Sequence, residues 1–245
     1  MMTDRVAVLI VNYNMPERTN ALVESLMRSG HPHDIIVIDN GSDIVGSSKY
    51  TTLQLEHNIQ TTGGWLAGLD SLKQKYFAYM FLITSAEIPD KENEIIGPLA
   101  STLKDDKQAV GVHPALPADS TTAWNHLITT GKSGIRKTWM IDNIASMYRA
   151  DWFDDIGRFD PDLIYGWGID LETSWKAREQ RRTLWINEDV YVKKITDIGY
   201  DMNRMNMSAQ KRRKVASDNM RGVLSRKYGD FWWLKMTEEY RVDYE

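Results

Sequence analysis

The chain has 245 residues, a formal net charge of −4 and no cysteine. Its length fits one large domain or one domain with an appendage, and the lack of cysteine excludes disulfides, thiolate nucleophiles and cysteine-based zinc sites. The apolar run at 6–11 is too short for a signal sequence or a transmembrane segment. We therefore expect a cytoplasmic protein without a membrane anchor of its own, located in the host cytoplasm if its source is viral.

Strand and helix signals alternate in the first half of the chain. Apolar, β-branched runs predict strands at 5–13, 34–39, 51–56 and 77–83, and helices are expected at 16–29 and 64–75. This order is typical of a doubly wound α/β fold, in which helices flank a mostly parallel central sheet.

The second half of the chain is more mixed. Short strands are expected at 108–113, 143–149, 184–186 and 190–192, and a helix at 171–180 with Asp170 as its N-cap. Residues 114–138 are rich in Pro, Thr, Ser and Gly and predict a long loop over one face.

The C-terminal part of the chain is basic. Residues 204–227 hold eight basic residues and one acidic residue, whereas 1–203 carry a net charge of −8. We expect a main domain at 1–203 and a helical extension at 204–245 that packs on it. The extension contains a basic helix at 207–227, and we expect the aromatic stretch 231–234 to dock on the body.

Polar residues at the ends of the predicted strands form the first candidate site. In an open α/β sheet, ligands bind beyond the carboxyl ends of the strands. Tyr13 offers an aromatic face for a base, Asp39 a carboxylate acceptor for a base or ribose, and Gly63-Gly64 a turn for phosphates at a helix start. For each loop taken singly, ordinary turn chemistry is the alternative. The patterns GxGxxG and GxxxxGK[ST] are both absent, which disfavours a dinucleotide fingerprint or a P-loop.

The segment 160–172 forms the second candidate site. It contains a Gly166-Trp167-Gly168 turn followed by Asp170. The glycines would let a backbone approach a ligand closely, and the indole has a flat face suited to a sugar ring. Asp170 could serve as a general base toward a hydroxyl, and an N-cap contributing about 1 kcal/mol is the alternative role.

As an ordered set, these motifs resemble family 2 glycosyltransferases of the GT-A fold, in particular rhamnosyl- and related transferases. The resemblance covers roughly residues 5–200 and is carried by VAVLIVNYN, DIIVIDNGSD, GGWLAGLD and IGRFDPDLIYGWGIDLETSWKAR. It implies a GT-A α/β fold with a mostly parallel central sheet flanked by helices. It also implies an inverting hexosyl- or deoxyhexosyltransferase of the kind used in polysaccharide biosynthesis, with a UDP-, dTDP- or GDP-sugar as donor.

The resemblance also implies roles for individual residues. Asp170 matches the family's catalytic base, which deprotonates the acceptor hydroxyl. Trp167 and Gly168 match acceptor-side positions. Residues that match or adjoin the donor-nucleotide site are Val11, Asn12, Tyr13, Asp39, Asn58, Gly63 and Gly64.

The sequence departs from this family at both of its metal-binding positions. The fourth strand should end in an Asp motif for Mg²⁺ or Mn²⁺, but 84–87 reads TSAE, and Glu87 is its only carboxylate. A late histidine expected as a further ligand is absent, and Lys193 and Lys194 stand in that stretch. One interpretation is that Lys193 or Lys194 neutralises the diphosphate leaving group in place of a metal. The other is that Glu87 holds the metal ion.

The acceptor stays open at this point: a glycan, a lipid-linked acceptor or DNA. The loop 114–138, with Trp124, His126 and Trp139, is expected to cover the acceptor cleft. The basic segment could meet phosphates of a membrane surface or of DNA, but we favour an amphipathic helix that packs through Val215, Met220, Val223 and Leu224.

Three other functions remain under consideration. One is a phage-type DNA-base glycosyltransferase, and another is a nucleotide-sugar-binding module without turnover, although Asp170 argues against the latter. The third, a nucleotidyltransferase, is disfavoured because residues 12–18 contain no glycine for a phosphate-binding loop.

Overall fold

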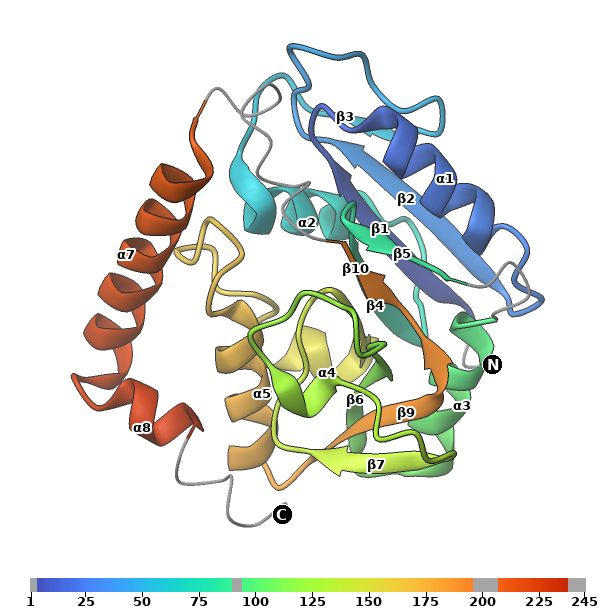
Figure 1. Ribbon diagram of the computed structural model, residues 1–245, viewed down its shortest axis with the longest axis vertical. Coiled ribbons are helices and arrows are strands. Elements are labelled where there is room, and N and C mark those ends of the chain that lie inside the picture. Colours follow the sequence, from blue (N-terminus) through green and yellow to red (C-terminus); the bar gives the residue numbers. More distant parts are fainter. Residues whose placement is uncertain (1–3, 90–93, 196–206, 238–245) are drawn as a thin grey trace.

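A mixed eight-stranded sheet forms the centre of the molecule (Figure 1). The computed structural model describes residues 4–89, 94–195 and 207–237. The strand order is β3-β2-β1-β4-β8-β6-β9-β7. The strands are β1 (Val6–Asn12), β2 (His33–Asp39), β3 (Leu53–Gln54), β4 (Ala78–Ile83), β6 (Ala109–Ala115), β7 (Ile135–Thr138), β8 (Ala145–Arg149) and β9 (Thr183–Tyr191). A separate antiparallel pair joins β5 (Ala86–Glu87) to β10 (Lys193–Lys194).

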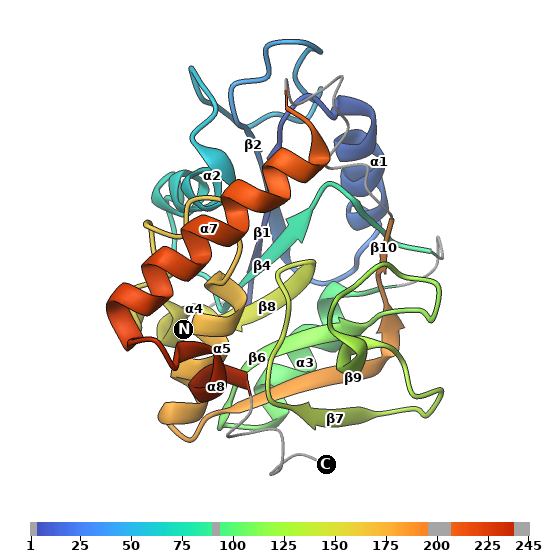
Figure 2. The ribbon, with the colours of Figure 1, turned by 60° about the vertical axis from the view of Figure 1, so that its left-hand side comes forward.

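Helices cover both faces of the sheet. Packing of buried side chains places α1 (Pro16–Leu26) and α3 (Ile96–Asp105) on one face, and α2 (Gln60–Asp70), α4 (Ala150–Asp155) and α5 (Ile169–Glu179) on the other. Beyond this second layer, α7 (Ala209–Tyr228) crosses the helices on the outside and leads into α8 (Trp232–Thr237), as Figure 2 shows. Among the described residues, none of the helices has the length and apolar character that a bilayer crossing requires.

The alternation of side chains along β1 explains how one strand serves both layers. Val6, Val8 and Ile10 belong to the core under α1 and α3, whereas Ala7 and Leu9 belong to the core under α2 and α5. All five side chains are fully buried. A strand covered on both faces reads as a continuous apolar run, which is why the sequence predicted it as a buried parallel strand.

Strand direction decides which residues meet at the edge of the sheet where β1 ends. β2, β1 and β4 are parallel, so Asp39, Asn12 and Ile83 end at the same edge. β8 runs antiparallel to β4, with Leu82 opposite Ala145, so the residues that precede β8 arrive at that edge too. The β5–β10 pair follows directly after β4 and adds a further wall there.

Most strands agree with the sequence prediction, but several features differ. The two short strands expected at 184–186 and 190–192 are one continuous strand, β9, and the predicted loop at 114–138 contains β7, which pairs with β9. Helices α3 and α4 were not predicted. In α3 the sequence Gly97-Pro98 reads as a break, but proline is compatible with the first turn of a helix.

The C-terminal helices pack on the body through few but deeply buried side chains. On α7 these are Val223 and Leu224, and on α8 they are Trp232 and Met236. The guanidinium of Arg178 in α5 donates to the Met236 carbonyl at 2.7 Å. The predicted domain boundary between residues 203 and 204 lies outside the described residues, so the division into two units stays a prediction.

Candidate functional site

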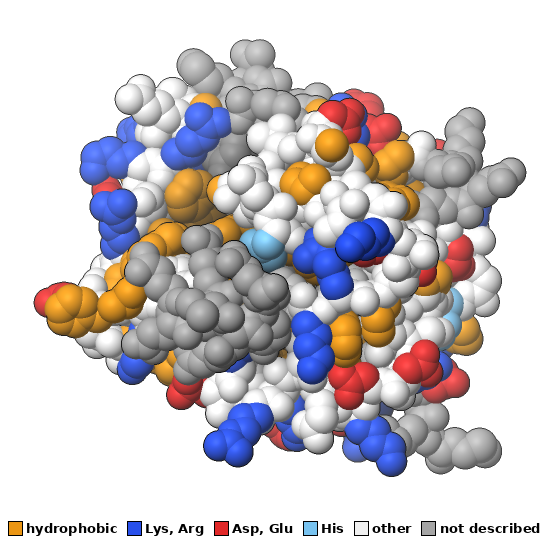
Figure 3. Space-filling view, turned by 60° about the horizontal axis from the view of Figure 1, so that its bottom comes forward, with side chains coloured by type: hydrophobic (Ala, Val, Ile, Leu, Met, Phe, Trp, Pro, Cys, Tyr) orange, Lys and Arg blue, Asp and Glu red, His pale blue; other side chains and the backbone are white. Residues whose placement is uncertain are grey.

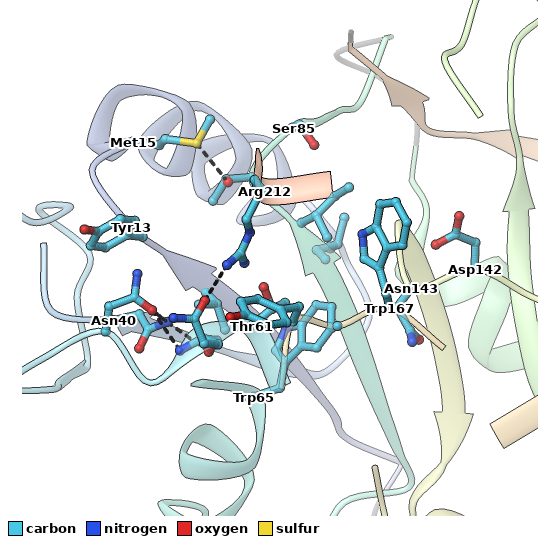
Figure 4. Close-up of a pocket in the computed structure, with 18 of the residues that line it drawn as sticks. Tyr13, Met15, Asn40, Thr61, Trp65, Ser85, Asp142, Asn143, Trp167 and Arg212 are labelled. Atoms are coloured by element: carbon cyan, nitrogen blue, oxygen red, sulfur yellow. Dashed lines mark hydrogen bonds between the residues drawn. The ribbon is translucent and has the colours of Figure 1, made fainter. Parts of the chain in front are cut away.

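A cavity of about 240 Å³ opens at the edge where β1 and β4 end (Figure 4). Its walls come from the end of β1, the start of α2, the segment after β4, the residues before β8, the loop before α5, and from β10 and α7. The residues that line it include Val11, Tyr13, Asn58, Gln60, Thr61, Trp65, Ser85, Asp142, Asn143, Tyr165, Gly166, Trp167, Lys194 and Arg212. Segments far apart in sequence therefore meet at one point.

Three of the predicted nucleotide residues line this cavity: Val11, Tyr13 and Asn58. The Tyr13 hydroxyl donates to Asp43 at 3.1 Å. Partial burial raises the pKa of Tyr13, and the hydrogen bond to Asp43 acts in the same direction. The ring therefore stays neutral near pH 7 and presents an aromatic face to the cavity.

Asp39 and Asn12 lie behind the cavity wall, and both are fully buried. Asp39 accepts hydrogen bonds from Asn12 Nδ2 at 2.7 Å, from the Ser42 backbone and hydroxyl at 2.8 Å each, and from Gln54 Nε2 at 2.9 Å. Burial alone would raise the pKa of Asp39, but these donors outweigh it and hold the pKa below its ordinary value. Asp39 is thus a charged anchor that ties the loop after β2 to β1 and β3.

The prediction of a turn at Gly63-Gly64 before a helix is wrong. Helix α2 begins at Gln60, so both glycines lie inside the helix instead of before it. Gly64 packs against β1, where an added Cβ would lie 3.0 Å from Val11 Cγ1. The absence of a side chain there serves close helix–sheet packing, and the helix start that reaches the cavity consists of Gln60 and Thr61.

The glycines of the Gly-Trp-Gly turn allow close approach of other segments of the chain. Gly166 and Gly168 have φ of +80° and +87°. An added Cβ would lie 3.0 Å from Thr61 Cγ2 at Gly166 and 2.7 Å from Met220 Cγ at Gly168. The turn therefore lies between α2 and α7, and Trp167 between the two glycines lines the cavity.

Replacing Gly168 by alanine is expected to lower stability by about 2 kcal/mol, because a left-handed backbone disfavours a side chain and Met220 stands in the way. At this chain length that corresponds to a melting temperature roughly 4–8 °C lower, measurable by calorimetry. Gly222→Ala on α7 is the matched control, because its Cβ would meet nothing within 4 Å. The control should gain up to about 1 kcal/mol of stability from helix propensity. Equal melting temperatures of the two variants would contradict the expected backbone strain at Gly168.

Asp170 lies in the first turn of α5, but the prediction that it is the N-cap is wrong. The N-cap is Gly168, and the Asp170 carboxylate accepts from the Leu171 backbone at 2.9 Å. Burial raises the pKa of Asp170 to about 7, and the negative charge of Asp142 contributes to the rise. Burial also raises the pKa of Asp142, which Lys194 opposes. Asp142 lines the cavity and Asp170 does not, but the two carboxylates are close enough that the charge of one affects the pKa of the other.

The two predicted lysines lie in different environments. Lys193 forms an ion pair with Asp119, whereas Lys194 lines the cavity. Alternation along β10 explains the difference, since successive strand residues face opposite sides. Of the pair, Lys194 is the residue that a ligand in the cavity can reach.

The described residues do not fit a divalent metal ion. No three His, Asp or Glu side chains among them lie close enough together to hold one. Glu87 is exposed and pairs in register with Lys193, and Ser85 rather than a carboxylate lines the cavity after β4. Mg²⁺ and similar ions need several oxygen ligands in a regular arrangement. The described part of the cavity lining provides one carboxylate, Asp142, which interacts with Lys194, and this is not such an arrangement.

The loop that was expected to cover the acceptor cleft contributes to an aromatic cluster, and Trp124, His126 and Trp139 are not among the residues that line the cavity. Trp124 lies 5.7 Å from Trp139 and 6.3 Å from Trp233 of α8, between ring centroids, and His126 lies 4.8 Å from Trp139. Trp233 and its neighbour Phe231 are exposed. Hydrophobic side chains gather on the left of the face in Figure 3, over α8.

The basic helix α7 packs on the body through one side. Three of its basic residues form ion pairs with described residues, one within the helix and two with the loop before α5. Ala216, Val223 and Leu224 are buried, and Val215 and Met220 are partly buried. Lys214 pairs with Asp218, Arg226 with Asp162 and Lys227 with Asp160. This distribution agrees with the predicted packing helix and does not favour a surface that binds DNA phosphates. Arg204 lies outside the described residues.

Asp142 and Arg212 are among the cavity residues that sequence reasoning missed. Asp142 directly precedes the predicted strand at 143–149, and an antiparallel strand brings its first residues to the edge where ligands bind. The sequence signal was present, but the direction of that strand was not predicted. Arg212 was counted only as part of the basic segment, and its place depends on how α7 docks.

Comparison with solved structures identifies the fold. GalNAc-T7, solved with UDP, GalNAc and Mn²⁺, superposes with a TM-score of 0.64 at 14% identity over 98% of this chain and 52% of that one. The mannosyltransferase PcManGT from Pyrobaculum calidifontis, solved with GDP-Man and Mn²⁺, gives 0.58 at 11% identity over 97% and 75%. This chain thus spans about half the length of the first. Neither the models of known protein families nor the curated proteins match the sequence.

These likenesses confirm the predicted fold class: the chain has a GT-A type fold, in which helices flank a mostly parallel central sheet.

Proposed function

We propose that this protein transfers a sugar from a nucleoside-diphosphate sugar to an acceptor hydroxyl, with inversion at the anomeric carbon. The observation that carries the proposal is the convergence of three kinds of group on one cavity: an aromatic ring from Tyr13, a cation from Lys194 and an indole from Trp167. Asp170, whose pKa burial raises to about 7, lies three residues beyond that indole. The GT-A fold and the ordered motif resemblance support the same class of reaction.

The nucleotide end of the donor is assigned to the wall at β1. Tyr13 would stack on the base, beside Val11 and Asn58, and Asp39 would hold this wall in shape from behind. Two buried donors beside the cavity, Trp65 Nε1 and Asn143 Nδ2, have no partner among the described residues. Because an unpaired buried donor costs free energy, they favour an oxygen-rich ligand.

The transfer itself needs a base and a stabilised leaving group. Asp170 takes the proton of the acceptor hydroxyl as that oxygen bonds to the anomeric carbon. The bond from the anomeric carbon to the diphosphate oxygen breaks, and its electron pair stays on the leaving group. Lys194 neutralises the charge that develops there. Trp167 would hold the acceptor sugar, and no step is assigned to a metal ion.

The finer features of this proposal rest on the motif resemblance. They are the family 2 assignment, the hexosyl or deoxyhexosyl donor and a glycan or lipid-linked acceptor. The pairing of charges along α7 gives no support to a DNA-base acceptor. A binding module without turnover would have no need for a proton acceptor beside the cavity.

A thermal-shift screen of UDP, dTDP, GDP and CDP, each with Mn²⁺ or with EDTA, tests the donor assignment. At one hundred times its Kd, a ligand adds about 2.7 kcal/mol, which is roughly 5–10 °C at this chain length. We expect one nucleotide to give this shift in EDTA. The shift should largely disappear in Lys194→Ala and persist in Lys193→Ala, the matched control whose ammonium is held by Asp119.

Two outcomes would contradict the donor assignment or part of it. A shift seen only with Mn²⁺ and unchanged in Lys194→Ala would remove the lysine from the diphosphate site and point to a metal ion. No shift with any of the four nucleotides would count against donor binding altogether.

A further inference from the structure

Arg212 of α7 reaches the same cavity as Lys194 of β10. The two residues come from different parts of the fold, since β10 follows the central sheet and α7 lies outside the helical layer (Figures 1 and 2). They are the two basic residues that line this cavity among the described part of the chain.

Two neutral groups hold the Arg212 side chain in place. Its Nη1 donates to Gln60 Oε1 at 2.5 Å, and its guanidinium carbon lies 4.5 Å from the centre of the Tyr165 ring. Figure 4 shows the guanidinium directed at the residues around Thr61. A side chain held on one edge and one face loses less conformational freedom when it binds a ligand.

The partners of Arg212 are themselves firmly placed. Gln60 is the first residue of α2 and has φ of +67°, and its backbone N–H donates to Asn58 Oδ1 at 2.8 Å. Tyr165 precedes Gly166, whose backbone contacts Thr61 closely. The start of α2, the loop before α5 and the start of α7 therefore meet at this guanidinium.

The chemistry of the two cations points to a particular ligand group. A guanidinium presents a planar fork of donors that matches two phosphate oxygens, and an ammonium acts as a compact positive charge. A diphosphate carries at least two negative charges on the oxygens of adjacent phosphate groups, so it can engage both residues at once. The described residues offer no carboxylate cluster through which a metal ion would do this instead.

We propose that Arg212 and Lys194 together form a two-cation site for a diphosphate group, and that α7 is therefore part of the donor site. This inference rests on the proposed function for the identity of the donor, but it makes its own claim about the pyrophosphate portion. It also gives the basic segment a role in ligand binding that its net charge did not reveal, because one of its arginines lines the cavity.

Docking of α7 suggests a second measurable effect. The later part of the helix is anchored on the body. Asn219 donates a hydrogen bond to the Asp162 carbonyl, Met220 packs at Gly168, and Val223 and Leu224 belong to the core. Arg212 lies in its first turn. A ligand that binds Arg212 ties down this first turn, so amide hydrogen exchange there should slow on binding.

Isothermal titration in EDTA at low ionic strength tests the two-cation site. Inorganic pyrophosphate and the four nucleoside diphosphates are titrated into the full chain and its variants. We expect pyrophosphate to bind, with a Kd at least roughly tenfold weaker in Arg212→Ala and in Lys194→Ala. Arg212→Lys should fall between, because it keeps the charge and loses the fork. Lys211→Ala is the matched control: it removes an exposed charge from the neighbouring position and should stay within about twofold.

The outcomes separate this inference from the proposed function. Nucleotides that bind Arg212→Ala as tightly as the wild type would overturn the two-cation site and leave the donor assignment standing. Pyrophosphate binding that depends on Arg212, with no nucleotide bound, would support the site and contradict the donor assignment. Binding of neither probe by the wild type would overturn both. Slower exchange at 209–213 with pyrophosphate in the wild type but not in Arg212→Ala supports the site without relying on affinity.

Discussion

Replacing Asp170 by asparagine is expected to lower the rate of sugar transfer by roughly 10²- to 10⁴-fold, the range over which a positioned proton acceptor acts. The amide has nearly the shape of the carboxylate and keeps an oxygen for the Leu171 N–H, which Asp170 accepts at 2.9 Å. It cannot take a proton from the acceptor hydroxyl. Release of nucleoside diphosphate in the presence of acceptor measures the loss, and nucleotide affinity by titration should stay unchanged.

The raised pKa of Asp170 also predicts how the rate of sugar transfer depends on pH. Because Asp170 must be ionised to act and burial raises its pKa to about 7, the rate should climb with pH up to about 7 and level off above it. Asp142→Asn removes the neighbouring negative charge, so the midpoint should move to lower pH. A wild-type midpoint near 4, the ordinary range of an aspartate, would contradict the assignment.

Stability gives a check on Asp170 that needs no substrate. A carboxyl whose pKa is raised on folding contributes stability below its unfolded pKa, and that contribution is lost as pH rises through the folded value of about 7. The wild type should therefore lose stability from about pH 4 to about pH 7 and change little above that. Asp170→Asn should lose less over this range, and a parallel decline in both proteins would count against the raised pKa.

Replacing Asp39 by alanine is expected to destabilise the protein by about 3 kcal/mol, because it removes a fully buried charged acceptor from several donors. The donors come from Asn12, Ser42 and Gln54. This loss corresponds to a melting temperature roughly 6–12 °C lower. Asp43→Ala in the same loop is the control: its carboxylate is exposed, so its melting temperature should fall clearly less than that of Asp39→Ala.

The Asp39 effect should depend on pH in the opposite sense to that of Asp170. Hydrogen bonds hold the folded pKa of Asp39 below its ordinary value, so its contribution is present above the unfolded pKa and is lost as pH falls through the folded one. The difference in melting temperature between wild type and Asp39→Ala should be full at pH 6 and shrink below pH 4. A variant that melts within 2 °C of the wild type at pH 6 would show that the loop does not need this carboxylate.

The sequence allowed the sheet to be predicted better than the site. β1, β2 and β4 are continuous apolar runs because helices cover both faces, and such runs are visible without a structure. β7 is a short edge strand with three of its four residues at least partly exposed, so it read as loop. Its strand conformation comes from pairing with β9, which local sequence does not encode.

The site could be predicted where residues follow a strand end or belong to a recognisable motif. Tyr13 was identified at a strand end and Trp167 in the Gly-Trp-Gly turn, and both line the cavity. Asp142 depends on β8 running antiparallel to β4, and Arg212 depends on the docking of a helix that belongs to no βα unit. The glycines were recognised, but the segments they approach, Val11, Thr61 and Met220, are tertiary neighbours.

The reversed strand β8 has a consequence for how the chain assembles during synthesis. β3, β2, β1 and β4 come from the first 83 residues and lie next to one another in the sheet, whereas the other four strands come from residues 109–191. The two halves join in the sheet through the β4–β8 ladder alone. Until Ala145–Arg149 has left the ribosome, β4 is an open apolar edge with a row of unpaired backbone groups. Translation through this interval is when the nascent chain is most exposed to aggregation, and a chaperone that shields strand edges would act then.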